Sequence, residues 1–120
     1  MTKFKGVELI SGSLISVNGN NVAFIALDGP GIWVIGSDMD PKRLTEDQVE
    51  EIEFVLGASE AVPLHSGRPD FVHGTKVTSD VDGNRYYGSI LAAFNGVVVA
   101  LTNDRKKIFH ELASRFELIQ

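Results

Sequence analysis

The chain has no cysteine, one tryptophan and four prolines among its 120 residues. Without cysteine it can form no disulfides, thiolate zinc sites or cysteine nucleophiles, which fits a reducing compartment. No apolar run approaches the roughly 20 residues that a membrane helix needs. The N-terminal residues also lack the apolar stretch and cleavage site of a signal peptide. We therefore expect a cytoplasmic protein.

The composition is that of an ordinary soluble globular protein, with 43% apolar and 22% charged residues. A chain of this length has room for one core, so we expect a single domain over residues 1–120. No internal repeat is evident. The net charge is −5 and there is no broad basic patch, so nucleic acid is not an expected partner.

Two helices are predicted from apolar spacing and capping signals. The first follows Pro41, where Thr45 and Gln48 can form a capping box, and it ends at Gly57. Its apolar positions are Val49, Ile52, Val55 and Leu56. The second begins near Asp104 and runs nearly to the C-terminus, with a stripe of Ile108, Leu112, Phe116 and Ile119.

Strands are predicted for most of the remainder. A first hairpin joins Val22 to Leu27 with Ile32 to Ile35 through a glycine-rich turn. Later strands flank Asp82-Gly83 and Asn95-Gly96 and comprise Phe71 to Thr78, Arg85 to Phe94, and Val97 to Leu101. The last two strands are apolar at almost every position, so both faces of the sheet there must be covered. We expect an α+β fold: a mainly antiparallel sheet with helices on both faces. The stretch from Lys3 to Ile15 is ambiguous and could contain a short helix.

Catalysis and metal binding receive little support. His65, His73 and His110 are the only candidate general bases near neutral pH, and no nucleophile turn accompanies them. Asp80 to Asn84 resembles half of a calcium loop but lacks the late glutamate, so a polar turn is the favoured interpretation. No phosphate-binding glycine loop is present. We expect no enzyme activity, no metal and no cofactor.

Two features are unusual. Arg105, Lys106 and Lys107 fall in the first turn of the second predicted helix, where the helix dipole disfavours cations. A negatively charged partner would explain them, and compensation by Asp104 and solvent is the alternative. Trp33 lies on a short predicted strand directly after a glycine-rich turn and could be either a core residue or an interface anchor.

Several short strings, in this order, resemble profilin. They are Ala26 to Val34, Leu44 to Val49, Leu64-His65-Ser66-Gly67, Phe94 to Val99, and Lys106-Lys107 with Glu111 to Phe116. The first helix of that family usually carries Trp and Tyr, whereas Phe4 is the only aromatic residue here. The chain also lacks a terminal aromatic residue. Small divergent profilins of the archaeal kind fit such a reduced version.

The resemblance implies a monomeric, cytoskeletal protein that binds actin or an actin homologue and regulates its polymerisation. By position, the implied actin-binding residues are Val72, Lys76, Arg85, Lys106, Lys107, His110 and Glu111. The implied site for a proline-rich ligand comprises Phe4, Trp33, Arg115 and Phe116. Because aromatic residues are missing there, we expect weak or no binding of proline-rich peptides. The basic run gives only thin support to phosphoinositide binding.

A second family class shares a similar order of strands and helices. Roadblock and longin-type modules bind small GTPases or each other, so fold alone does not decide function. A roadblock-type protein would be a homodimer, whereas a profilin would be a monomer, and gel filtration separates the two.

Overall fold

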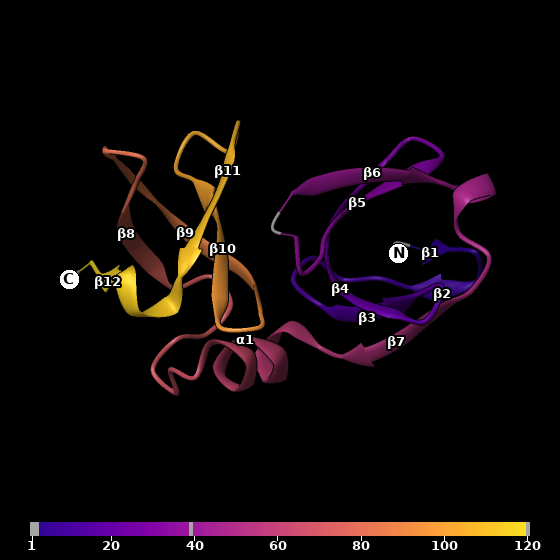
Figure 1. The fold of residues 1–120 in the computed structure, drawn as a ribbon, viewed down its shortest axis with the longest axis horizontal. Helices are drawn as coiled ribbons and strands as arrows, with labels where there is room; N and C mark the ends of the chain where they lie inside the picture. The colour runs from indigo at the N-terminus through magenta and orange to yellow at the C-terminus, as the bar shows by residue number, and fades with distance from the viewer. Residues whose placement is uncertain (1–2, 39, 120) are drawn as a thin grey trace.

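Two five-stranded antiparallel sheets lie side by side in the computed structural model, which describes residues 3–38 and 40–119 (Figure 1). We call residues 3–56 the N-terminal unit and residues 67–119 the C-terminal unit. In the sequence the two units are joined by one α-helix, α1 (Ala58–Ser66). The helix ends at Gly67, whose backbone is in the left-handed conformation. The two units are thus consecutive in the sequence.

The N-terminal unit begins with a short hairpin of β1 (Lys3–Phe4) and β2 (Val7–Glu8). Its sheet has the strand order β6-β5-β4-β3-β7. The elements are β3 (Leu14–Val17), β4 (Asn20–Asp28), β5 (Gly31–Ile35), β6 (Pro41–Thr45), the 3-10 turn η1 (Glu46–Gln48) and β7 (Ile52–Leu56).

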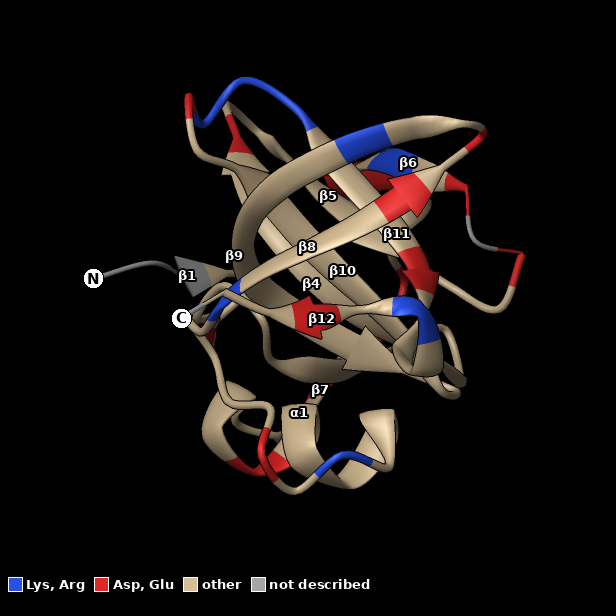
Figure 2. Cartoon of the chain, turned by 90° about the vertical axis from the view of Figure 1, so that its left-hand side faces the viewer, with Lys and Arg blue, Asp and Glu red and all other residues tan. Residues whose placement is uncertain are grey.

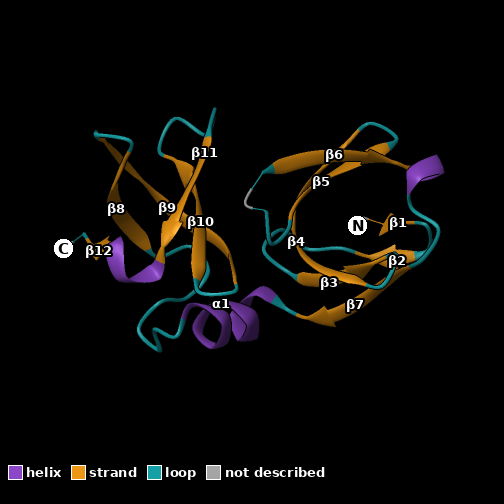
Figure 3. Ribbon diagram, in the orientation of Figure 1, coloured by secondary structure: helices purple, strands orange, loops and turns teal. Residues whose placement is uncertain are grey.

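The C-terminal unit repeats this topology, with the strand order β11-β10-β9-β8-β12. Its elements are β8 (Lys76–Val81), β9 (Asn84–Phe94), β10 (Val97–Thr102), β11 (Ile108–Leu112), the 3-10 turn η2 (Ala113–Arg115) and β12 (Glu117–Leu118). In both units four strands form a meander, and a 3-10 turn then leads to a fifth strand that pairs with the first (Figure 3). The chain therefore contains a structural repeat that its sequence did not reveal.

The repeat extends to the first hairpin turn of each unit. Asn18 and Gly19 join β3 to β4 with φ of 52° and 82°, and Asp82 and Gly83 join β8 to β9 with φ of 51° and 82°. Both central residues have positive φ, which asparagine, aspartate and glycine adopt most readily. This chemistry fixes the register of both hairpins.

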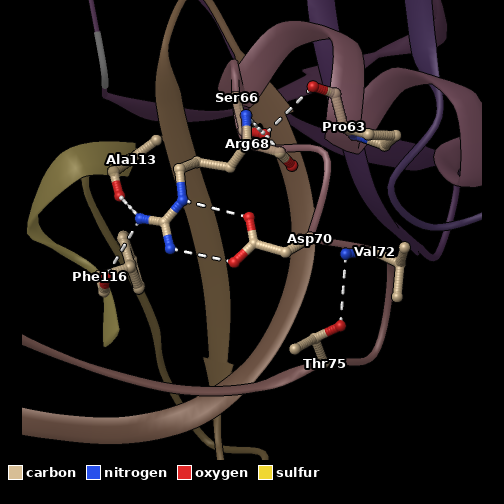
Figure 4. Close-up of polar contacts among 8 residues, drawn as sticks. All are labelled: Pro63, Ser66, Arg68, Asp70, Val72, Thr75, Ala113 and Phe116. Carbon is tan, nitrogen blue, oxygen red and sulfur yellow. Dashed lines mark hydrogen bonds and ion pairs between the residues drawn. The ribbon is translucent and has the colours of Figure 1, made fainter. Parts of the chain in front are cut away.

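A cation also holds the 3-10 turn in each unit. Lys5 Nζ donates to the carbonyl oxygens of Glu46 and Val49, at 3.4 and 2.6 Å. Arg68 Nη1 donates to the carbonyl oxygens of Ala113 and Phe116, at 3.3 and 3.5 Å (Figure 4). In both cases the acceptors belong to the first residue of the turn and to the residue after its end. We call these two contacts the turn latches.

Three hydrophobic clusters form the core. One lies in the N-terminal unit and includes Phe24, and a second lies in the C-terminal unit and includes Phe71. The third joins the two units through Leu14, Ala23, Ile25, Ile35, Ala61, Ala92, Phe94 and Val99. At this junction a Cβ on Gly12 would lie 2.1 Å from the carbonyl oxygen of Leu91, so only glycine permits this approach.

The expected α+β fold with helices on both faces of a sheet is wrong. The structure is built from two five-stranded antiparallel sheets and the short β1-β2 hairpin, and α1 is the one α-helix among the described residues. No helix in this part of the chain is long and apolar enough to cross a membrane.

The helix predicted after Thr45 is replaced by η1 and β7. The capping box does form, since Gln48 Oε1 accepts the Thr45 N–H at 2.8 Å. The chain then leaves the turn at Val49, whose φ of −107° and ψ of 103° are extended. From Ile52 onward, β-branched and aromatic residues favour a strand, and β7 pairs with β3. The pairing of β7 with β3 therefore outweighs the local capping signal for a helix.

The second predicted helix is replaced by β11, η2 and β12. Phe109 stacks between Tyr86 and Phe116, with ring centroids 5.2 and 5.9 Å away. The rings of Phe109 and Phe116 lie in the core of the C-terminal unit, and Ile108–Leu112 gains a backbone pairing with β10 that a helix could not make. Sheet pairing and tertiary packing together therefore outweigh the helical spacing of the apolar residues.

The predicted hairpins are confirmed. β4 pairs with β5, and β9 pairs with β8 and β10 around the predicted turns. The strand predicted from Phe71 begins only at Lys76, and the ambiguous stretch before Ile15 forms β1, β2 and the start of β3. Both faces of β9 and β10 are covered as expected. Val62 of α1 packs in the core of the C-terminal unit, and the other face packs against the N-terminal unit together with Ala61 of α1.

Candidate functional site

A cavity of about 510 Å³ lies between the two units. Its N-terminal wall is formed by Ile25, Ala26, Trp33 and Pro41. Its C-terminal wall is formed by Leu101, Arg105, Lys106, Lys107 and Ile108. The only tryptophan and the basic run therefore line the same cavity from opposite units.

A second cavity of about 480 Å³ continues the first. The two share Ile25, Ala26, Leu101 and Arg105, and the second reaches His73. We call these two cavities together the cleft. His73 Nδ1 lies 2.8 Å from the carbonyl oxygen of Leu91, so one ring nitrogen is already engaged with the backbone.

The basic run lies on the connection between β10 and β11, residues 103–107, which we call the basic loop. The Thr102 N–H donates to the carbonyl of Lys107 at 2.9 Å, and the Arg105 N–H donates to the carbonyl of Thr102 at 2.8 Å. Asp104 Oδ1 accepts from the Thr102 hydroxyl at 2.6 Å and from the Lys106 N–H at 3.0 Å. These bonds fix the backbone of the basic loop, in which the three cations follow one another (Figure 2).

The charge on Asp104 stabilises this conformation of the basic loop. The hydrogen bond from the Thr102 hydroxyl, and then that from the Lys106 N–H, hold the pKa of Asp104 below its usual range. Asp104 is therefore ionised at neutral pH and anchors the loop. Arg105, Lys106 and Lys107 are exposed, and none forms an ion pair with a described residue.

Trp33 is held on the opposite wall by its indole nitrogen. Its Nε1–H donates to Asp28 Oδ2 at 3.1 Å, and Arg43 Nε donates to the same oxygen at 2.9 Å. The bond from Trp33, followed by that from Arg43, lowers the pKa of Asp28. Trp33 is 36% exposed and belongs to none of the three core clusters. Of its two interpretations, the structure favours a residue accessible to a ligand.

The residues implied for actin binding are spread over the C-terminal unit. Lys106 and Lys107 lie at the cleft, and His110 and Glu111 follow on β11. Lys76 and Val72 are exposed at and before the start of β8. Arg85 lies on β9 and forms ion pairs with Asp80 and Glu117, which belong to β8 and β12. Only the two lysines line the cleft.

The residues implied for a proline-rich ligand do not share a groove. Phe4 is buried in the N-terminal core, and Phe116 is buried in the C-terminal core. Arg115 is exposed on η2, where its Nη1 lies 3.6 Å from Glu111 Oε2. Trp33 alone lines the cleft. Stacking of a polyproline helix on several parallel aromatic rings therefore finds no platform at these four positions.

The candidate calcium segment is a hairpin turn in the structure. Asp82 and Gly83 are its central residues, and Asp80 pairs with Arg85. Over residues 3–38 and 40–119, no three histidine, aspartate or glutamate side chains gather in a way that could hold a metal ion.

Several supporting residues of the cleft were missed in the sequence. Asp28 and Arg43 orient Trp33, and Thr102 and Asp104 shape the basic loop. The Thr102-x-Asp104 spacing was a usable signal, because such side chains commonly cap the backbone of tight turns. Arg43 is fifteen residues from Asp28 in the sequence, so no local sequence pattern indicated that the two side chains would pair.

No protein-family model and no curated protein matches the chain. Among solved structures, the crystal structure of the ADCP1 tandem Agenet domain 3-4 is similar at 14% sequence identity and a TM-score of 0.37. The similarity covers 91% of this chain and 79% of that chain. A likeness at this level supports neither a family nor a function for the chain.

Proposed function

We propose that the chain is a non-catalytic binding module whose cleft takes an acidic segment of a partner protein. One observation carries this proposal: the only tryptophan and the only tight run of cations face one cavity of about 510 Å³. An apolar side chain of the partner enters beside Trp33, while its acidic residues approach Lys106 and Lys107.

The lining of the cavity supports this ligand chemistry. Ile25, Leu101 and Ile108 contribute apolar surface next to Trp33, and tryptophan is among the commonest energetic anchors of protein interfaces. The cations stand at the rim without ion-pair partners among the described residues, so a carboxylate would not have to displace an internal partner. Complementary charge of this kind raises association rates and selects partners.

A protein segment fits better than a nucleic acid. Affinity for a phosphate backbone needs many cations along an extended track, and single strands also need several stacking aromatics. The cleft offers three cations in one loop and a single tryptophan, and the whole chain carries a net charge of −5.

Actin binding stays a prediction of the profilin resemblance. An acidic partner of that kind falls within the proposed ligand chemistry. However, the resemblance and the roadblock alternative both relied on an order of strands and helices that the structure does not have. The cleft is the feature that now supports binding.

The test is an unbiased peptide selection. The chain is immobilised, and a displayed library of random twelve-residue peptides is enriched on it. We expect enriched sequences that combine Asp or Glu with an apolar residue and that bind saturably. Enrichment of basic sequences, or no enrichment at all, would contradict the proposed function.

A matched pair of variants locates the site. Lys106→Ala with Lys107→Ala removes two positive charges from the cleft, and we expect the selected peptide to bind at least tenfold more weakly. Arg85→Ala with Arg115→Ala removes two positive charges from outside the cleft and should change affinity less than twofold. Equal losses in both variants would instead indicate a diffuse charge effect or the wider surface implied for actin.

A further inference from the structure

We infer that the bound segment is extended and pairs with the free edge of β11 as an added strand. This inference rests on the proposed function and specifies the conformation of the ligand. In this mode, called β-augmentation, backbone hydrogen bonds give affinity and alternate side chains give specificity.

The hydrogen-bond pattern of β11 identifies the backbone groups that face outward. The Thr102 N–H donates to the Lys107 carbonyl, and the Ala113 N–H donates to the Gly96 carbonyl. In an antiparallel pair, hydrogen-bonded and non-hydrogen-bonded residue pairs alternate. With the register that pairs Leu101 with Ile108, the N–H and C=O groups of Ile108, His110 and Leu112 therefore point away from β10.

Two of these three residues have unpaired backbone groups at the edge of the sheet, where β8 approaches β11 and Val81 lines a cavity shared with His110 and Leu112. The Leu112 N–H is occupied, because Glu111 Oε1 accepts it at 2.9 Å. The backbone groups of Ile108 and His110 have no hydrogen-bond partner among the described residues. An added strand can thus form backbone hydrogen bonds with these two residues. They lie in the N-terminal part of β11, directly after the basic loop.

The corresponding edge of the N-terminal unit is blocked. β6 begins with Pro41, which corresponds to Ile108 and has no N–H to donate. Lys42 and Arg43 follow, and proline and lysine on edge strands are common devices against strand addition. β11 has the sequence Ile-Phe-His-Glu-Leu and contains neither proline nor lysine. The repeat therefore leaves one of two equivalent edges available.

The end of β11 next to the basic loop matches the proposed ligand. Ile108 lines the cleft beside the cations, whereas a further cavity of about 310 Å³ borders His110 and Leu112 and is also lined by the acidic residues Asp82 and Glu111. Side chains on β11 alternate between the core of the C-terminal unit, where Phe109 is buried, and the face of the cleft. Every second side chain of an added strand faces the cleft, and its acidic end meets the basic loop.

Amide hydrogen exchange of the whole chain tests the pairing directly, using the peptide enriched in the selection. At saturation we expect exchange at Ile108 and His110 to slow at least tenfold, and exchange at Lys42 and Arg43 to change less than twofold. Saturable binding at the cleft without protection of Ile108 and His110 would overturn strand addition while leaving the proposed function intact. A failed selection would overturn both.

N-methylation of the same peptide supplies a second, independent readout. If the peptide pairs as a strand, only alternate N–H groups face β11, so single N-methyl groups should weaken binding at least tenfold with a period of two. A uniform response along the peptide would overturn the inference. Protection of Ile108 and His110 that rises with protein concentration without peptide would also overturn it, because the edge would then serve a second copy of the chain.

Discussion

The two units share a plan and differ in what they leave exposed. Both have the same strand order, the same left-handed hairpin turn and a cation that holds the 3-10 turn. They differ in the connection between the third and fourth strands. In the N-terminal unit Asp38 of this connection pairs with Lys42, whereas the cations of the basic loop have no such partner.

This difference separates the residues that build the fold from those that can bind. The shared features are internal hydrogen bonds and turns, which any chain with this topology must satisfy. The cations, the open edge of β11 and Trp33 satisfy no shared requirement, and all three lie around the cleft. The candidate binding features are therefore those that the repeat does not explain.

The largest expected effect comes from removing the central aromatic residue of each unit. Phe24 and Phe71 are 1% and 0% exposed, and replacing either with alanine should lower the free energy of unfolding by about 3–5 kcal/mol. Because the third cluster joins the units, we expect one cooperative transition in both variants. Urea unfolding followed by circular dichroism and by Trp33 emission checks this. Two separate transitions would show that the units are energetically independent.

The turn latches should differ in strength. Arg68 also pairs with Asp70, and its guanidinium carbon lies 4.1 Å from the centre of the Phe71 ring. We expect Arg68→Ala to destabilise the chain by about 1–3 kcal/mol. Lys5→Ala removes hydrogen bonds from an exposed side chain and should cost about 1 kcal/mol or less.

Thermal unfolding of both latch variants measures this difference, and Arg68→Lys is the matched control. A lysine keeps the charge but cannot bond Asp70 and both carbonyls with one planar group, so it should recover only part of the loss. Equal losses for Lys5→Ala and Arg68→Ala would show that the two latches are equivalent.

The local part of the fold was predictable from the sequence, and the global part was not. Asn95-Gly96 and Asp82-Gly83 located their hairpins because a tight turn needs residues that adopt positive φ. Thr45 and Gln48 formed their capping box, yet no helix followed, because β7 gained a pairing with β3 that is remote in the sequence. The apolar character of β10 correctly indicated two covered faces but could not indicate that another sheet covers one of them.

The candidate site divides in the same way. The basic run and Trp33 were recognisable because each breaks a local rule, one by concentrated charge and the other as a lone large aromatic after a turn. Their meeting in one cleft depends on how the two units pack, which no local pattern encodes. The residues implied by the resemblance to profilin were placed by an element order that does not occur, so they scatter over both units.

The smallest expected effect is an acid response in each unit. The pKa of Asp28 and that of Asp104 are both lowered in the folded state. The stabilisation that each carboxylate gives is therefore present above the ordinary aspartate pKa and is lost as the pH falls through the lowered one. Below that range Trp33 loses its charged acceptor and its emission should shift. Asp28→Asn should remove this shift, and its persistence in that variant would assign the response to another group.

The central claim is that a ligand contacts Trp33 and the basic loop at the same time. Because Trp33 is the only tryptophan, its fluorescence during titration with the selected peptide reports on the cleft alone. We predict a saturable change in emission for the unmodified chain, and the same change at tenfold or higher peptide concentration for Lys106→Ala with Lys107→Ala. Binding that leaves Trp33 emission unchanged, or that is equally tight in the double variant, would contradict the account.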